Sequence, residues 1–312
     1  MIDVIIPTHV KDTETLELCI EQAKKNVLNV NKVYVVSKDK LTDSAEWIPE
    51  SAFPFSLDDV VNIIGEGWRT TWYYQQVLKF YAHEACDGLL DDYLIVDSDT
   101  MFLRPIDFYE EESGKIYFNF GYEKYPSYDE HMKKLVPGLN RVDDKSGITH
   151  SMVFSRDILT ELKKTVELKH DSPLWKAFLD ITNHKYLSVD NQSHDANGRA
   201  SEYEIYFNYA RTYFRDRVIC RPLNSILAYK GNLHKVKMNF GSRTNRLPAE
   251  AVIDNTTEEF SSLEESFRYV IDKTRENNYD SVTFQKHTRQ DFDEYKNDSV
   301  EYLRENTYVE NK

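Results

Sequence analysis

The stretch that decides the fold is Tyr93-Leu94-Ile95-Val96-Asp97-Ser98-Asp99-Thr100-Met101-Phe102-Leu103. An apolar run leads to two acidic residues one position apart, and the sequence then turns apolar again. Such a run is typical of a strand buried on both faces, as in a parallel sheet covered by helices. The pattern therefore predicts a buried strand that carries carboxylates to the edge of a sheet.

Asp97 and Asp99 predict a metal site at this edge. On a regular strand, residues two apart project from the same face, so both carboxylates would lie together. Two like charges in one place repel and lose hydration, and a divalent cation relieves both penalties. Hard oxygen ligands suit Mg²⁺ or Mn²⁺, which commonly bridge carboxylates to substrate phosphates. The alternative is a solvated turn that closes a buried strand.

Composition limits the class of protein. The chain has 312 residues, 40% of them hydrophobic, which suits one large α/β domain with appendages or two small domains. A formal net charge of −14 argues against nucleic-acid and membrane-surface binding. The three cysteines lack metal-ligand spacing and are typical of a reducing compartment. With neither a signal peptide nor a membrane-spanning run in the sequence, we expect a cytoplasmic protein.

The N-terminal third predicts a parallel sheet. Val4–Ile6 resembles a strand that ends at Pro7 and Thr8, a helix is expected over Thr13–Asn26, and Lys32–Ser37 resembles a second strand. Strand, helix, strand is the opening of a parallel α/β sheet, whose loops after each strand share the ligand-binding edge. We expect Thr8 to lie at that edge with Asp97 and Asp99.

A helix is expected over residues 68–82, directly before the acidic strand. Trp72, Gln76 and Lys79 share one of its faces, so Gln76 and Lys79 could reach a sugar or a diphosphate. The alternative is a solvated helix edge. Just upstream, Val60–Ile64 reads as a short strand.

The second half predicts strands over residues 116–121 and 147–154, a long loop with one short helix over 122–146, and helices over 156–166, 174–183 and 200–210. The last of these helices begins with Ser201 and Glu204 in the pattern of a capping box. Beyond residue 256 the composition turns charged, and amphipathic helices are expected over 260–271 and 291–303. We therefore expect a catalytic domain over residues 1–250, divided near residue 105, and a helical C-terminal extension over 251–312 packed on it.

Five ordered segments resemble the glycosyltransferases of the GT-A fold that carry an Asp-x-Asp motif. They are the Ile6-Pro7-Thr8 strand end, the aromatic helix with Gln75-Gln76 and Lys79, the Asp97-Ser98-Asp99 stretch through Pro105, and the later segments His150–Phe154 and Ser201–Glu204. More narrowly, they resemble a poorly characterised bacterial and viral family. The resemblance spans roughly Ile2 to Leu227 and implies a Rossmann-like, mixed, mainly parallel sheet flanked by helices.

The resemblance also implies roles. Asp99, helped by Asp97, would hold Mn²⁺ or Mg²⁺ on the diphosphate of a UDP-sugar or GDP-sugar, and Pro7 and Thr8 would contact the base or ribose. Donor-binding charge would come from Lys79 or Arg69, with Gln76 beside them. The acceptor is expected to be a glycan or another hydroxyl compound.

Four further residues have alternative roles in this reading. Glu202 or Glu204 would be the base that an inverting reaction requires. His234 is either a third metal ligand or an ordinary surface histidine. His150 is either a structural hydrogen-bonding residue or part of the acceptor site.

Two other readings compete. A phosphatase of the haloacid dehalogenase type also places Asp-x-Asp after an apolar strand, but it expects Thr or Val where this chain has Met101, and it usually uses the first strand. A sugar- or nucleotide-binding module could keep the same fold without turnover, although both aspartates and the candidate bases are present.

Overall fold

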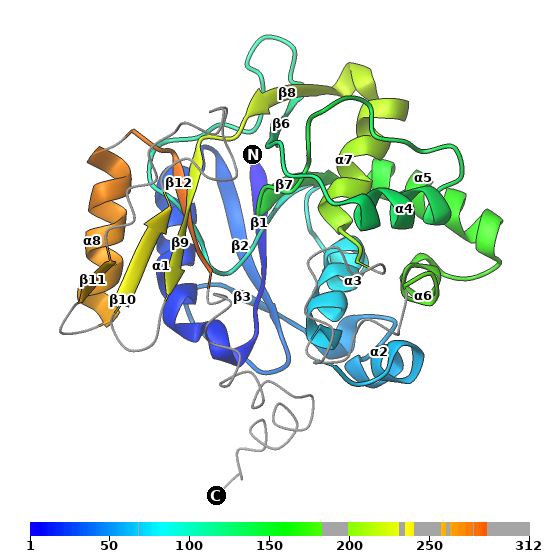
Figure 1. Cartoon of the computed structure of the whole chain (residues 1–312), viewed down its shortest axis with the longest axis horizontal. Coiled ribbons are helices and arrows are strands. Elements are labelled where there is room, and N and C mark those ends of the chain that lie inside the picture. Colours follow the sequence, from blue (N-terminus) through cyan, green and yellow to red (C-terminus); the bar gives the residue numbers. More distant parts are fainter. Residues whose placement is uncertain are drawn as a thin grey trace, which may run out of the picture.

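The computed structural model describes residues 1–67, 69–182, 199–230, 235–239, 257–259, 263–276 and 278–285. Figure 1 shows two sheets, with the helices α2 to α7 on one side of the molecule and α8 on the other. No helix in these ranges is long and apolar enough to cross a membrane.

The first sheet is mixed and mainly parallel, as the sequence predicted. Its strands are β1 (Ile2–Pro7), β2 (Val30–Ser37), β3 (Glu46–Pro49), β4 (Asp92–Val96) and β7 (Ser151–Ser155), in the order β3-β2-β1-β4-β7. The first four strands of that order run parallel, and β7 pairs with β4 antiparallel. The buried strand expected before Asp97 is therefore β4, in the interior of this sheet.

The order of the strands creates a switch point between β1 and β4. From β1 the chain moves outward through β2 to β3, then returns to place β4 on the other side of β1. In open α/β sheets the crevice beyond the carboxyl ends of two such diverging strands is where ligands bind. Pro7 ends β1 and Asp97 follows β4, so both lie at this point.

Helices cover the sheet at the positions that the periodicity predicted, with one exception. They are α1 (Thr13–Asn26), α2 (Leu57–Ile64), α3 (Thr70–Ala85), α4 (Pro126–Leu135), α5 (Arg156–His170), α6 (Leu174–Asp180) and α7 (Glu202–Tyr213), with single 3₁₀ turns at η1 (Val10–Asp12), η2 (Glu50–Ala52) and η4 (Arg215–Arg217). The exception is Val60–Ile64, which belongs to helix α2 rather than to a strand. Ser56 and Asp59 form a reciprocal capping box that starts this helix, and a capping box decides between helix and strand in a short apolar run.

A second sheet corrects the prediction of a helical C-terminal extension. Its strands are β11 (Thr257–Glu259), β10 (Lys235–Asn239), β9 (Ser225–Lys230), β12 (Ser281–Gln285) and β5 (Thr100–Phe102), in that order. β12 pairs antiparallel with β5 and parallel with β9, so a C-terminal strand lies beside the segment that follows Asp99. Of the predicted C-terminal helices, the first is α8 (Leu263–Glu276), and residues 291–303 lie outside the described ranges.

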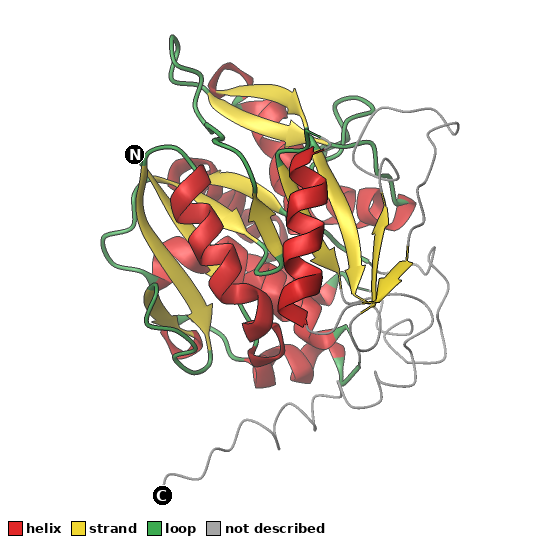
Figure 2. Ribbon diagram, turned by 90° about the vertical axis from the view of Figure 1, so that its left-hand side faces the viewer, coloured by secondary structure: helices red, strands yellow, loops and turns green. Residues whose placement is uncertain are grey.

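Figure 2 views the molecule from the side that carries α8 and shows the strands of the second sheet together. A small separate pair, β6 (Ile116–Phe120) and β8 (Val218–Pro222), runs parallel.

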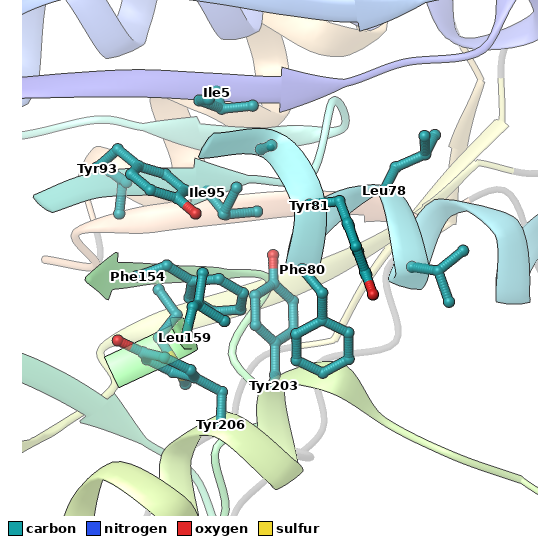
Figure 3. Packing of buried hydrophobic residues seen from close by; sticks show 14 of the residues in the cluster. Ile5, Leu78, Phe80, Tyr81, Tyr93, Ile95, Phe154, Leu159, Tyr203 and Tyr206 are labelled. Carbon is teal, nitrogen blue, oxygen red and sulfur yellow. The ribbon is translucent and has the colours of Figure 1, made fainter. Parts of the chain in front are cut away.

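Each sheet has its own core. The larger core surrounds the first sheet and α3, α5 and α7, and Figure 3 shows Tyr203 of α7 beside Phe154 of β7 and Phe80 of α3. The smaller core joins β5 to α8 and β12 through Met101, Leu103 and apolar residues of the C-terminal segment. The stretch around Asp97 and Asp99 therefore passes from one core to the other.

Candidate functional site

Asp97-Ser98-Asp99 is a turn between the two sheets rather than the end of a regular strand. The amide of Thr100 donates to the carbonyl of Asp97 at 2.9 Å, and the amide of Asp97 donates to the carbonyl of His150 at 2.9 Å. The prediction that Asp97 and Asp99 stand on a regular strand is therefore wrong, because β4 ends at Val96. Because the chain turns between them, the two carboxylates have different surroundings.

Asp97 is held by three side chains from three parts of the chain. Its Oδ1 accepts hydrogen bonds from Lys79 Nζ at 2.5 Å and the Tyr203 hydroxyl at 3.1 Å, and its Oδ2 accepts one from His150 Nδ1 at 3.1 Å. Burial alone would raise the pKa of Asp97, but the Lys79 ammonium and the His150 imidazole hold it well below its usual range. Asp97 is thus an ionised centre that joins α3, α7 and the residue before β7.

Lys79 lies between two carboxylates. Its Nζ contacts Asp97 and, at 2.6 Å, Oε1 of Glu202, and it sits 4.3 Å from the ring centroid of Tyr203. Burial would lower the pKa of Lys79, yet the two carboxylates raise it. The structure brings the predicted residues Lys79, Glu202 and Asp97 together, but the charge of Lys79 is neutralised within the protein rather than held for a diphosphate.

Asp99 has the opposite surroundings. Its Oδ1 is buried and has no hydrogen-bond partner, while its backbone carbonyl accepts a hydrogen bond from Phe284 at 2.8 Å. Burial, followed by the charge of Asp97, raises the pKa of Asp99 to about 7. A buried carboxylate oxygen without a protein partner calls for a physical explanation, and binding of a cation is one.

The surroundings of Asp99 suit a cation that takes one ligand from the protein and the others from substrate and water. Among the described residues, no group of three or more His, Cys, Asp or Glu side chains is placed to hold a metal. Mg²⁺ is usually bound through one or two carboxylates, with substrate phosphates and water completing its shell. The one carboxylate oxygen of Asp99 without a partner suits that mode and not a closed protein cage.

Pro7 and Thr8 lie at the end of β1, beside the turn. The Thr8 amide donates to the carbonyl of Val36 at 2.8 Å, and its hydroxyl donates to the carbonyl of Ile6 at 3.2 Å. The carbonyl of Pro7 accepts a hydrogen bond from Gln75 Nε2 at 3.4 Å. These contacts tie the β1 end to β2 and α3 and fix the backbone at the switch point.

Glu204 is not brought to the turn. Its carboxylate is fully buried and accepts from Arg141 at 2.6 Å, Asn208 at 2.9 Å, Gly147 at 2.8 Å and Ser146 at 3.0 Å. Its amide donates to Oγ of Ser201 at 3.2 Å, which is the helix cap that the sequence predicted. With four donors on its two oxygens, Glu204 pins the segment before β7 onto α7, which argues against its role as a base.

Of the other predicted residues, His150 contacts the turn and Arg69 does not. His150 has a left-handed backbone, with a φ of 58°, which is rare for a residue with a side chain and often marks a functional or strained site. Arg69 precedes α3 and lies over the ring of Trp72 at 5.1 Å. Ten residues, or about 15 Å of helix, separate it from Lys79, so it is not part of the Asp97 cluster. His234 lies outside the described residues.

Three contributors escaped the sequence analysis. Tyr203, which binds Asp97, is placed between two acids that drew attention first. Cys19 lies beneath the turn with its Sγ 3.8 Å from the carbonyl of Asp97, and burial raises the pKa of its thiol. Phe284 and its strand were hidden by the charged composition beyond residue 256. The alternation of Ser281, Val282, Thr283 and Phe284 was the signal that could have revealed a strand.

Comparisons with known proteins add little to this geometry. No family model matches the chain, and no curated protein matches it. One solved structure, described as the apo form of WbbM, a bifunctional glycosyltransferase, aligns with 97% of this chain and 50% of its own, at 13% identity and a TM-score of 0.41. The chain thus spans about half the length of that protein. A likeness of this degree carries no argument about activity.

Proposed function

We propose that this protein is a metal-dependent glycosyltransferase that moves a sugar from a nucleotide-diphosphate-sugar to a hydroxyl group of a glycan. The observation that carries the proposal is the buried, unpartnered Oδ1 of Asp99 at the switch point of a mainly parallel sheet. An oxygen in this position is suited to a hard cation shared with a diphosphate.

Asp97 and Asp99 have different roles in this proposal. Asp99 would hold Mn²⁺ or Mg²⁺, which when bound neutralises the charge that develops on the leaving diphosphate. Asp97 fixes the turn through Lys79, Tyr203 and His150, so that the Asp99 carboxylate is oriented before any ligand binds. The backbone at Pro7 and Thr8 would face the nucleoside, at the other side of the same switch point.

The candidate base is Glu202. It begins α7, its amide donates to Gln76 Oε1 at 3.0 Å, and its Oε1 accepts from Lys79. The Glu202 carboxylate and Asp97 therefore contact the same residue, Lys79, whereas the Glu204 carboxylate is paired with Arg141. An inverting reaction would use Glu202 to take the proton of the acceptor hydroxyl.

The phosphatase alternative is less compatible with these contacts. If the first aspartate of the motif were the nucleophile that attacks phosphate, that residue would be Asp97. Its two oxygens accept three hydrogen bonds from Lys79, Tyr203 and His150, which would oppose nucleophilic attack.

Nucleotide-sugar binding tests the proposal directly. The melting temperature of the chain is measured with UDP-sugars and GDP-sugars, each with and without Mn²⁺, because a ligand that binds only the native state raises it. We expect a Mn²⁺-dependent rise with at least one donor, lost in Asp99→Asn and kept in Asp180→Asn. Asp180 is the matched acid, because it ends α6 away from the turn.

A donor that stabilises the protein should also be hydrolysed or transferred slowly, with release of the nucleoside diphosphate. No Mn²⁺-dependent shift with any donor would sink the proposal. A metal-independent shift that survives Asp99→Asn would instead support the binding module, and phosphate release from phosphomonoesters would support the phosphatase.

A further inference from the structure

The carboxamide of Gln76 has a fixed orientation. Gln76 is 1% exposed on α3, and its Oε1 accepts a hydrogen bond from the amide of Glu202 at 3.0 Å. Because a backbone N–H can be met only by the oxygen of a carboxamide, Nε2 must point away from it. Gln76 therefore presents a hydrogen-bond donor whose direction is set by the start of α7.

This donor is buried and has no hydrogen-bond partner among the residues that the structure describes. Gln75, its neighbour in the sequence, shows the usual arrangement, since its Nε2 donates to the carbonyl of Pro7 at 3.4 Å. A buried donor without a partner costs free energy and is rare in native proteins. Gln76 cannot turn its Nε2 elsewhere without losing the Glu202 amide, so the geometry favours an oxygen atom that arrives with a ligand.

Gln76 belongs to the candidate site. It lies three residues before Lys79 on α3, which places the two side chains at neighbouring positions of one helix face. Lys79 Nζ contacts both Asp97 and Glu202, and the amide of Glu202 contacts Gln76. The donor without a partner therefore lies beside the candidate base.

The charges around Gln76 favour a neutral ligand oxygen. The ammonium of Lys79 is balanced by Asp97 and Glu202, so it is not available to a diphosphate. In the proposed function the diphosphate lies at Asp99 with the metal, and the transferred sugar lies between the diphosphate and the base. The hydroxyl oxygens of that sugar are then the neutral acceptors that a carboxamide beside Glu202 can reach.

We propose that Gln76 Nε2 donates a hydrogen bond to one hydroxyl oxygen of the transferred sugar, and that this bond selects nucleotide-sugars that carry that hydroxyl. The inference rests on the proposed function and adds a residue that determines its donor specificity. A site that hydrogen-bonds a hydroxyl rejects the analogue that lacks it, because the buried protein group is then left without a partner. Gln76 would therefore discriminate between sugars rather than between nucleotides.

Isothermal titration calorimetry in the presence of Mn²⁺ tests the inference with two kinds of ligand. The probes are UDP-glucose, UDP-galactose, UDP-N-acetylglucosamine and GDP-mannose, each compared with UDP or GDP. In Gln76→Met, whose side chain has a similar length and no donor, we expect the nucleotide-sugar to bind about tenfold more weakly than to the parent protein. UDP or GDP should bind within about twofold of the parent, because neither carries a sugar.

Deoxy analogues separate a contact with the sugar from a structural role of Gln76. Analogues of the nucleotide-sugar with the highest affinity, each lacking one hydroxyl, are titrated into the parent and into Gln76→Met. One analogue should bind the parent about tenfold more weakly than the intact donor does, and should bind both proteins equally, because the bond is already absent. A structural role would instead weaken every analogue in the variant.

Two further variants complete the test. Gln76→Leu is a second side chain without a donor, and either Gln76 variant suffices if the other does not fold, which melting temperatures decide. Gln75→Met is the matched control. Because Gln75 contacts the backbone of Pro7, its loss should weaken nucleotide-sugar and nucleoside diphosphate by the same factor.

Equal weakening of nucleotide-sugar and nucleoside diphosphate in the Gln76 variants overturns the inference, and so does the failure of every deoxy analogue to bind parent and variant equally. If Mn²⁺-dependent donor binding is lost in Asp99→Asn while the Gln76 variants bind donors as the parent does, the inference falls and the glycosyltransferase proposal stands. If donors bind without Mn²⁺ and the Gln76 variants weaken only the nucleotide-sugars, the contact with the sugar stands and the glycosyltransferase proposal falls. Absence of binding by any donor contradicts both.

Discussion

The Asp97-Ser98-Asp99 turn has an aspartate at each end, and the two aspartates differ in their hydrogen-bond partners and in the direction of their pKa shifts. Asp97 faces the first sheet and accepts hydrogen bonds from Lys79, Tyr203 and His150, so its pKa lies far below its usual range. Asp99 is joined to the second sheet through its backbone carbonyl, keeps a buried Oδ1 without a partner, and has a pKa raised to about 7.

This difference separates a residue that stabilises the turn from a residue that can bind a ligand. Both carboxylate oxygens of Asp97 accept hydrogen bonds from other parts of the chain, and its charge is balanced inside the protein. Asp99 is held through its backbone, by the amide of Phe284, while Oδ1 of its side chain has no partner. A pair of aspartates that reads as two equal metal ligands in the sequence is, in the fold, one positioning residue and one candidate ligand.

The largest expected effect comes from exchanging the two acids for amides. Asp97→Asn should destabilise the metal-free protein by about 3 kcal/mol, because it removes the charge that balances the buried Lys79. Asp99→Asn should stabilise it by about 1 kcal/mol at a pH above 7, because it removes a desolvated carboxylate next to Asp97. Urea unfolding without metal measures both.

Equal losses of stability in the two variants would contradict this comparison, since both carboxylates would then contribute equally to the stability of the turn. Asp39→Asn, an exposed acid at the surface, is the control for the loss of one negative charge. A stabilised Asp99→Asn that has also lost Mn²⁺-dependent nucleotide-sugar binding would be the sharpest support for the division of roles.

Much of the fold around this turn was predictable, because its signals are local. The apolar run before Asp97 specified a buried parallel strand, and the helix over Thr13–Asn26 follows from its periodicity. What the sequence could not provide is the direction of each carboxylate. That depends on a turn whose geometry is set by hydrogen bonds to His150 and Phe284, far away in the chain.

The candidate site was predictable in part for the same reason. Lys79, Asp97 and Glu202 were each chosen for residue type, and long-range packing of α3 against α7 brings them together. Glu204 satisfied the same criterion and is a structural anchor for Arg141. Two acids two residues apart on a helix point in different directions, and only the partner elements decide which of them reaches a site.

A second effect tests whether an unpartnered buried atom alone makes a site. His131 also has one, Nδ1, while its Nε2 lies 2.8 Å from the carbonyl of Phe178 in the packing of α4 against α6. Burial lowers the pKa of His131 from 6.5 to about 4. His131 is buried between α4 and α6, whereas Asp99 lies at the switch point of the first sheet.

Between pH 6.5 and 4 the unfolded chain binds a proton at residue 131 that the native state excludes, so His131 makes stability fall as the pH falls. The loss should reach about 2 kcal/mol across this window and should be absent from His131→Met. Urea unfolding as a function of pH measures the difference between the two proteins. Mn²⁺-dependent nucleotide-sugar binding should be the same in both, and a loss of binding in His131→Met would mean that the Asp99 oxygen is not distinctive.

The smallest effect concerns the strand that supports Asp99 from the second sheet. The hydroxyls of Thr100 and Thr283 are buried and 2.9 Å apart, which couples β12 to the residue after Asp99. Thr283→Val should cost about 1 kcal/mol, because it leaves the Thr100 hydroxyl without a partner, whereas the double Val variant should recover most of that stability. If β12 orients Asp99, both variants should bind Mn²⁺ and nucleotide-sugar more weakly than the parent, even where stability is recovered. Unchanged ligand affinity in both would mean that the Phe284 amide alone positions Asp99, and that the C-terminal strand contributes stability and nothing more.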